Sequence, residues 1–202
     1  MRSIAALVFP GFETLDLFGP IEMFGMLPEE FSIFIVAEHA GQVASTHGQR
    51  VAVDSTFAQA DSFDMLLIPG GPGARTEVGN PALLAWLNSA ASQADITMSV
   101  CTGSALLAKA GLLDGRKATS NKMSFAWAMA QGPDVDWVAR ARWVEDGRLF
   151  TSSGVSAGMD MSLAVIERLL GRDTAHQVAR YAEYDWHEDA SSDPFAEHYG
   201  LS

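Results

Sequence analysis

The chain contains one cysteine, Cys101, at a place in the sequence where a thiol could act as a nucleophile. Residues 96–100 form an apolar run that leads into Cys101, and the run that follows it has the small and apolar residues of a helix. A strand that turns sharply into a helix at the nucleophile is a nucleophile elbow, and Ser99 and Gly103 are small enough for the close approach that this turn needs. The helix N-terminus predicts a lowered pKa for the Cys101 thiol. The alternative is a small buried hydrophobe without chemistry.

Attack on carbon creates negative charge, so hydrogen-bond donors are expected near the nucleophile. One predicted donor is the backbone N–H of Thr102, directly after Cys101. The other is Gly71 in the Pro69-Gly70-Gly71-Pro72-Gly73 loop, because glycines let a chain turn and present an N–H group without obstruction. The same loop is also typical of a tight turn that only ends a strand.

A reactive cysteine needs an acid–base partner, and the histidines of this chain are poorly placed for that role. None follows Cys101 directly, and we expect all five to lie mainly on the surface: His39, His47, His176, His187 and His198. Asp16 is the alternative, because it stands among apolar residues and a desolvated carboxyl group has a raised pKa. Asp16 could instead cap a helix, but Pro20 as a first-turn residue would place the cap at Gly19 and leave Asp16 free.

The elements around these residues predict an α/β protein. Apolar runs typical of buried strands alternate with helical patterns, so we expect a three-layer αβα sandwich with a mostly parallel sheet. The predicted strands are residues 4–9, 31–37, 65–68 and 96–100, with a hairpin of residues 140–145 and 149–152. The predicted helices are residues 20–26, 81–91, 104–110, 157–170 and 174–184. Ligands of such sheets bind beyond the carboxyl ends of strands, where the loops at Pro10, Pro69 and Cys101 lie.

Length and composition restrict the partners. The 202 residues, 48% of them hydrophobic, fit one domain over residues 1–202, with residues 185–202 as a polar acidic surface tail. The net charge of −12 argues against binding to nucleic acid and to anionic membranes, and favours neutral or cationic partners. A single cysteine excludes an internal disulfide and a multi-cysteine metal site. We see no signal peptide and no membrane span, and therefore expect a cytoplasmic protein.

Taken together, these motifs resemble the ThiJ/PfpI superfamily and, within it, the isonitrile hydratases. The segments that carry the resemblance are Phe9-Pro10-Gly11-Phe12, Leu15-Asp16-Leu17-Phe18-Gly19-Pro20-Ile21-Glu22, residues 68–73, Val100-Cys101-Thr102-Gly103-Ser104, Ala110-Gly111-Leu112-Leu113-Asp114-Gly115, and residues 151–160. The resemblance implies a flavodoxin-like sandwich of the class I glutamine amidotransferase type. It also implies hydration of an isocyanide to an N-substituted formamide without cofactor or metal, with Cys101, Asp16 and Thr102 as the catalytic residues.

The sequence departs from its relatives at two places. Peptidase-like members carry a histidine directly after the cysteine, and Thr102 in that place argues against protease activity. Many relatives have Thr-His-Trp about twenty residues later, whereas this chain has Thr119-Ser120-Asn121-Lys122-Met123, so we expect a different pocket there. Regulators with this domain append a DNA-binding region, for which we expect no room in 202 residues with this charge.

The activity that we expect is attack of the Cys101 thiolate on a small-molecule isocyanide to give a thioimidate, which water then hydrolyses. The alternatives are a non-enzymatic or redox-sensing stress-response protein, and a glyoxalase-like or amidase-like activity on small carbonyl compounds. We also expect a homodimer, because Phe125, Trp127 and Met129 form an apolar stretch, although the same pattern fits core packing.

Overall fold

The computed structural model describes residues 1–60 and 62–201, and a seven-stranded sheet in the order β10-β11-β7-β6-β1-β2-β5 forms its centre. The strands are β1 (Arg2–Leu7), β2 (Phe31–Ala37), β5 (Ser55–Thr56), β6 (Met65–Ile68), β7 (Ile96–Ser99), β10 (Trp143–Asp146) and β11 (Leu149–Ser152). All neighbours are parallel except the antiparallel hairpin of β10 and β11. The predicted α/β class and mostly parallel sheet are therefore confirmed.

The central strands β6 and β7 are uniformly apolar or small because both faces of the sheet are covered, and every residue of both is buried. Without the edge strands β5 and β10, the order along the chain is 2-1-3-4-5, which is the flavodoxin-like order. The direction of winding reverses between β1 and β6. Parallel sheets of this kind bind ligands at that reversal, beyond the carboxyl ends of the strands.

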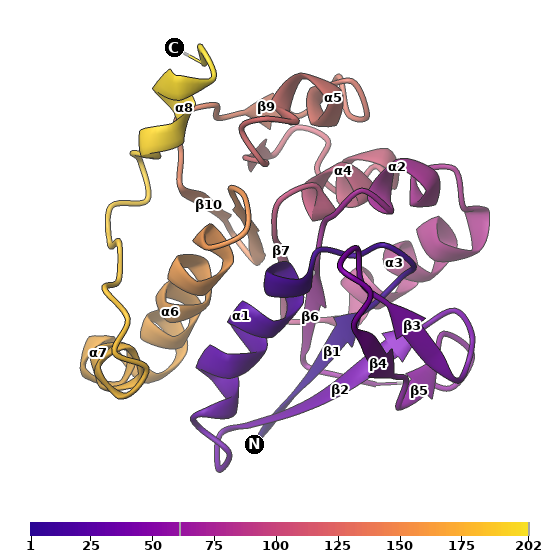
Figure 1. Cartoon of the computed structure of the whole chain (residues 1–202), viewed down its shortest axis with the longest axis horizontal. Helices are drawn as coiled ribbons and strands as arrows, with labels where there is room; N and C mark the ends of the chain where they lie inside the picture. Colours follow the sequence, from indigo (N-terminus) through magenta and orange to yellow (C-terminus); the bar gives the residue numbers. More distant parts are fainter. Residues whose placement is uncertain (61, 202) are drawn as a thin grey trace.

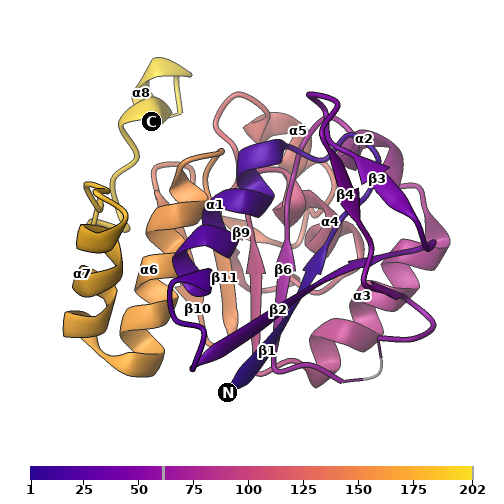
Figure 2. The ribbon, with the colours of Figure 1, turned by 60° about the horizontal axis from the view of Figure 1, so that its bottom comes forward.

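Helices cover both faces of the sheet (Figures 1 and 2). On one face lie α1 (Thr14–Gly25) and α6 (Ala157–Leu170), which contact each other, and α7 (Arg172–Tyr181) packs on α6. On the other face lie α3 (Pro81–Gln93) and α4 (Gly103–Lys109), which contact each other, and α4 also contacts α2 (Ala74–Glu77) and α5 (Phe125–Met129). Two small two-stranded sheets complete the fold: β3 (Gln42–Ala44) with β4 (Arg50–Ala52), and β8 (Lys117–Ala118) with β9 (Asp136–Trp137).

The first helix differs from the sequence prediction. It begins at Thr14 and contains Pro20, so Asp16 lies in its first turn and Gly19 is not its cap. Pro20 has no N–H group, and the carbonyl group of Asp16, four residues earlier, therefore receives no helical hydrogen bond from it. The helix continues through this defect because its buried face, including Leu17, Met23 and Phe24, packs into the core.

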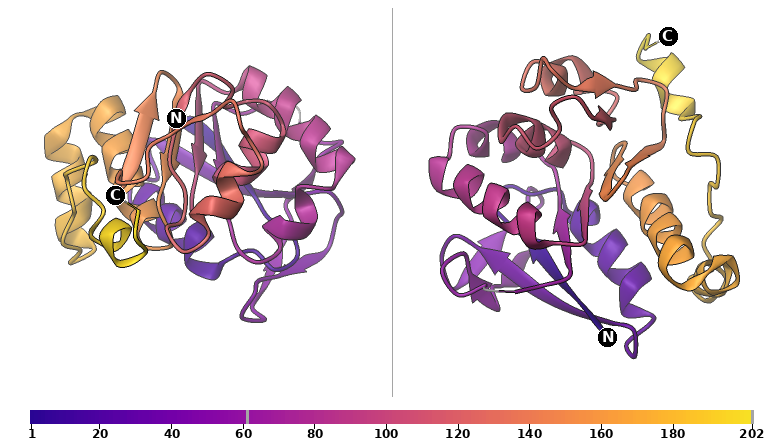
Figure 3. Two further views of the ribbon diagram at one scale, coloured as in Figure 1. Left: turned by 90° about the horizontal axis from the view of Figure 1, so that it is seen from above. Right: turned by 180° about the vertical axis from the view of Figure 1, so that it is seen from behind.

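The acidic segment predicted as a surface tail is mostly exposed over residues 185–201, but three of its residues are buried. It runs from α7 along α6 to a short helix, α8 (Pro194–His198), as Figures 1 and 3 show. Trp186 is buried and packs edge-on against His176, and Asp193 and Ala196 are buried as well. These three buried residues attach the otherwise polar C-terminal segment to the rest of the fold. None of the helices within the described ranges is both long and apolar enough to span a bilayer.

Candidate functional site

Cys101 lies at a sharp turn between β7 and α4, and the predicted elbow is confirmed. Its backbone has φ = +57°, a left-handed conformation that is rare and strained for a residue with a side chain. Gly103 is required two residues later, because a Cβ atom there would collide with the carbonyl oxygen of Ile68. The residue is 6% exposed, so the turn holds Cys101 at the edge of the core.

Asp16 faces this thiol from the first turn of α1 and is completely buried. Its Oδ2 accepts a hydrogen bond of 2.9 Å from the N–H of Gly70, whereas its Oδ1 has no hydrogen-bond partner among the described residues. Burial raises the pKa of Asp16 to about 7, and the charge of Glu13 adds to this effect, while the N–H of Gly70 and the Cys101 thiol oppose it. Asp16 therefore changes protonation near neutral pH.

The pKa of Cys101 is raised well above its ordinary value, and the predicted lowering is wrong. Burial is the main cause and the negative charge of Asp16 the second, while the N–H and hydroxyl groups of Thr102 act in the opposite direction. The stabilisation of a thiolate by the N-terminus of α4 does not outweigh the loss of solvation on burial. Cys101 therefore rests as a thiol beside the Asp16 carboxyl group.

Thr102 and Gly71 connect the elbow to the glycine-rich loop. The Gly71 N–H donates to Thr102 Oγ1 over 2.9 Å, and the Thr102 hydroxyl lies 3.3 Å from the carbonyl oxygen of Gly71. Gly70 is needed because a Cβ atom there would collide with the backbone nitrogen of Thr102. The structure thus brings Cys101, Asp16, Thr102 and Gly71 together, but the Gly71 N–H that was expected to be a free donor is bonded to Thr102.

A cavity of about 250 Å³ opens at Cys101, beside the reversal of the strand order. Its lining residues are Glu13, Gly71, Pro72, Arg75, Cys101, Thr102, Asn121, Met123, Ser124 and Val155. Val155 was not predicted as a site residue, although its φ of +49° is a second strained position at this cavity. Its backbone also acts to lower the pKa of Asp16. No sequence pattern marks a valine for such a conformation.

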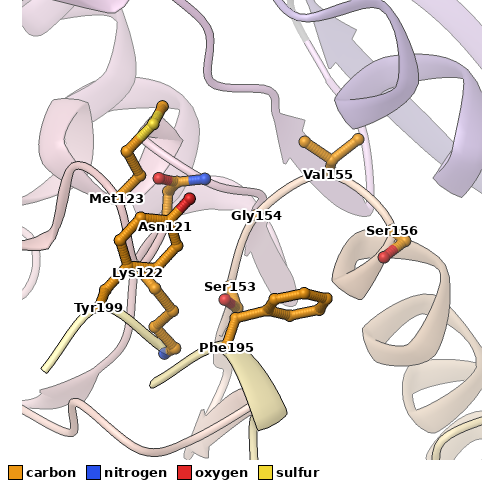
Figure 4. A pocket seen from close by; sticks show the side chains of 9 residues that line it. All are labelled: Asn121, Lys122, Met123, Ser153, Gly154, Val155, Ser156, Phe195 and Tyr199. Carbon is orange, nitrogen blue, oxygen red and sulfur yellow. The ribbon is translucent and has the colours of Figure 1, made fainter. Parts of the chain in front are cut away.

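A second cavity of about 230 Å³ adjoins the first, and the two share Asn121, Met123 and Val155 (Figure 4). Its other lining residues are Lys122, Ser153, Gly154, Ser156, Phe195 and Tyr199. Sequence reasoning assigned no chemistry to the last two, because they belong to the segment that was expected to be a tail.

The segment that replaces Thr-His-Trp lies at both cavities. Asn121 packs against Gly154 and accepts a hydrogen bond of 3.0 Å from the Ser124 N–H. Lys122 is buried, which lowers its pKa to about 8, and its Nζ donates to Thr119 Oγ1 (2.8 Å) and to the carbonyl oxygen of Ala141 (2.6 Å). None of the described residues that line the two cavities is a histidine. The segment that departs from the relatives therefore forms part of the wall of both cavities.

The chain was compared with known proteins. Residues 2–168 match the model of the DJ-1/PfpI family. The isonitrile hydratase of Pseudomonas putida is 35% identical over 183 residues, which cover 90% of this chain and 78% of that protein. The HTH-type transcriptional regulator GbdR of Pseudomonas aeruginosa is 29% identical over 91% of this chain, which spans 51% of the regulator.

Solved structures agree with this relationship. The crystal structure of a ThiJ/PfpI family protein from Pseudomonas syringae has a TM-score of 0.80 and 33% identity, and the match covers 91% of this chain and 75% of that one. Drosophila melanogaster DJ-1beta has the same fold, with a TM-score of 0.80 and 22% identity over 92% and 99% of the two chains. The elbow, the sheet order and these matches lead to one conclusion: the chain belongs to the DJ-1/PfpI family.

Proposed function

We propose that this protein is a cofactor-independent isonitrile hydratase, which adds water to an isocyanide to give an N-substituted formamide. The observation that carries the proposal is a buried carboxyl group, Asp16, with one unpartnered oxygen beside the only thiol, at a cavity. The 35% identity to the Pseudomonas putida isonitrile hydratase supports the same activity.

The first step joins the thiol to the terminal carbon of the isocyanide. The Asp16 carboxylate takes the proton of Cys101, the sulfur forms a bond to the isocyanide carbon, and Asp16 then delivers the proton to that carbon. The product is a thioimidate, R–N=CH–S–Cys101, in which every atom of the substrate and the thiol is retained. A base with a pKa of about 7 suits this transfer in both directions at neutral pH.

The second step adds water to the thioimidate carbon. Asp16 takes one proton from the water as the oxygen bonds to carbon, and Asp16 delivers this proton to the nitrogen. The C–S bond then breaks, the remaining hydroxyl proton returns to sulfur through Asp16, and the formamide R–NH–CHO leaves. The Thr102 hydroxyl, beside Cys101, positions the water, and the N–H group of Thr102 stabilises the polar intermediate.

The other activities considered fit the site less well. Glyoxalase-like or amidase-like chemistry creates an oxyanion at once and needs free N–H donors, but the Gly71 N–H is already bonded to Thr102. A redox sensor needs an exposed thiolate of low pKa, whereas Cys101 is buried and its pKa is raised. Addition to an isocyanide makes no oxyanion in its first step and accepts a resting thiol.

The direct test is turnover by the purified protein without added metal or nucleotide. We expect cyclohexyl isocyanide to give N-cyclohexylformamide, measured by chromatography, and Cys101→Ala to abolish turnover because no covalent intermediate can form. Tyr181→Ala, which changes an exposed tyrosine on α7 far from both cavities, is the matched control and retains full activity. Absence of any formamide across alkyl, cycloalkyl and aryl isocyanides would overturn the proposal.

We propose further that the protein works as a homodimer in the cytoplasm. A catalytic thiol must stay reduced, which favours a reducing compartment. The apolar stretch contributes less to an interface than expected, because Phe125 is buried and Trp127 lies under the Arg75 guanidinium, which leaves Met129 at 43% exposed. Sedimentation equilibrium at micromolar concentration tests the dimer, and a species of 21.6 kDa would contradict it.

A further inference from the structure

The two cavities beside the elbow adjoin and share part of their lining, and we call the two together the recess. Asn121, Met123 and Val155 line both, so they stand between the Cys101 end and the C-terminal end of this recess. Each cavity alone, about 250 and about 230 Å³, is smaller than the roughly 300 Å³ at which ligand pockets begin. Only the two together offer the space of an ordinary ligand pocket.

Two aromatic side chains close the far end of the recess. Phe195 and Tyr199 come from α8 and the residue after it, and Figure 4 shows Phe195 on the side of the cavity away from Met123 and Val155. Phe195 is 52% exposed and Tyr199 is 46% exposed, so their apolar surfaces are not used up by core packing. Lys122 also lines this end, but its Nζ is hydrogen-bonded to Thr119 and Ala141. The end of the recess away from the thiol is therefore mainly apolar and aromatic.

Helix α8 has only five residues, and buried polar contacts of Asp193 hold it in place. Asp193 is 5% exposed, accepts a hydrogen bond of 2.9 Å from the Phe195 N–H, and donates its own N–H to the Arg140 carbonyl oxygen over 2.7 Å. Its Oδ2 lies 3.9 Å from the Arg142 guanidinium. Ala196 is buried on the inner side of the helix. The two aromatic side chains thus stand on a fixed support.

We infer that Phe195 and Tyr199 determine substrate specificity, and that they select isocyanides whose organic group is an apolar ring. Such a group would extend from the carbon at Cys101 past Asn121 and Val155 to the aromatic faces, which bind rings by stacking and edge contacts. The match to the family model ends at residue 168, before both residues. The inference rests on the proposed function for its substrate class.

The first test does not depend on hydratase activity. Cys101 is the only cysteine, so its alkylation by iodoacetamide and by N-benzyl iodoacetamide is followed unambiguously by mass spectrometry. We expect Phe195→Ala and Tyr199→Ala each to lower the ratio of the benzyl rate to the parent rate by about threefold to tenfold, the scale of an aromatic contact. Tyr181→Ala removes an exposed tyrosine that lines neither cavity, and leaves the ratio unchanged. An unchanged ratio in both α8-region variants would overturn the inference.

The second test uses turnover, as the ratio of kcat/KM for benzyl isocyanide to that for methyl isocyanide. We expect Phe195→Ala to lower this ratio by a similar factor, mainly through KM, and Phe195→Leu to restore part of it. If the wild-type protein hydrates isocyanides and neither variant changes the ratio, the specificity inference fails while the proposed function stands. If the wild-type protein hydrates no isocyanide but the alkylation ratio falls in the Phe195 and Tyr199 variants, the proposed function fails, while the binding of rings by these two residues is supported.

Discussion

Asp16 in α1 and Asp160 in α6 both lie on the buried face of their helix, and both are 0% exposed. Their carboxylate oxygens nevertheless have very different numbers of hydrogen-bond partners. In Asp160, Oδ2 accepts from Arg142 Nε and Nη2 at 2.9 and 2.8 Å, and Oδ1 accepts from the Tyr184 hydroxyl and the His187 N–H, both at 3.0 Å. In Asp16, only Oδ2 is bonded, to the Gly70 N–H. Equal burial therefore does not mean equal roles.

The difference shows what a buried carboxyl group can be used for. Asp160 has a full set of donors and a guanidinium, which offset the cost of removing its charge from water. Asp16 has one donor and no cation, so its charged form is penalised and a proton is taken up near neutral pH. The first arrangement joins α6 to Arg142, just before β10, and to the segment after α7, and the second leaves an oxygen available for proton transfer.

The largest effect that we predict is on stability, for Asp160→Ala. The variant leaves the Arg142 guanidinium buried without its main partner, and we expect it to lose about 3–5 kcal/mol of unfolding free energy, measured by urea denaturation. Glu29→Ala, at an exposed carboxylate, is the control and changes stability by less than about 0.5 kcal/mol. Equal losses in the two variants would remove the distinction between paired and surface carboxylates.

The next largest effect is on activity, for Asp16→Asn. The amide keeps the shape of the side chain but cannot take or give the proton, so we expect formamide production to fall about 100-fold or more. Unfolding free energy should not fall, because the variant removes a buried group whose charged form is penalised. Turnover that survives the substitution unchanged would leave the reaction class intact and show that Asp16 is not the acid–base group.

The sequence identified Asp16 but not the network around Asp160, and the reason is how local each signal is. The turn at Cys101 is marked by residues close to it in the sequence, such as Gly103, and Asp16 is recognised as a charged residue among apolar neighbours. The partners of Asp160 are Arg142, just before β10, and Tyr184 and His187, in the segment after α7, and no spacing along the chain connects them.

The fold shows the same division. The strands of residues 31–37, 65–68 and 149–152 and the helix of residues 157–170 have the predicted bounds, because continuous apolar runs and a glycine stop mark them. The start of α1 was misplaced because tertiary packing tolerates Pro20 inside a helix. The lowered pKa of Cys101 was wrong because burial by distant segments, which the sequence does not reveal, outweighs the local helix end.

The comparison also predicts a pH dependence. Asp16 holds its proton to about pH 7 in the folded state but only to about pH 3.8 when unfolded, so between these values the folded state binds more protons. The stability contribution of Asp16 therefore falls as pH rises, with a limiting slope of about 1.4 kcal/mol per pH unit. We expect the unfolding free energy of wild type minus that of Asp16→Asn to decrease from pH 5 to pH 7 in urea titrations. A difference that is flat over this range would mean that Asp16 is not protonated in the folded protein.

The smallest effect concerns Thr102, which connects the two sides of the site without exchanging the proton. Thr102→Val keeps the shape of the side chain but removes the acceptor of the Gly71 N–H and the hydroxyl assigned to the water. We expect kcat to fall about threefold to tenfold, the scale of one lost hydrogen bond, with the pH profile unchanged because Asp16 still titrates. Thr102→Ser retains the hydroxyl and should keep most of the activity. A loss as large as that of Asp16→Asn, or a shifted pH profile, would place Thr102 in the proton transfer itself and would end the separation between a group that moves protons and one that only positions water.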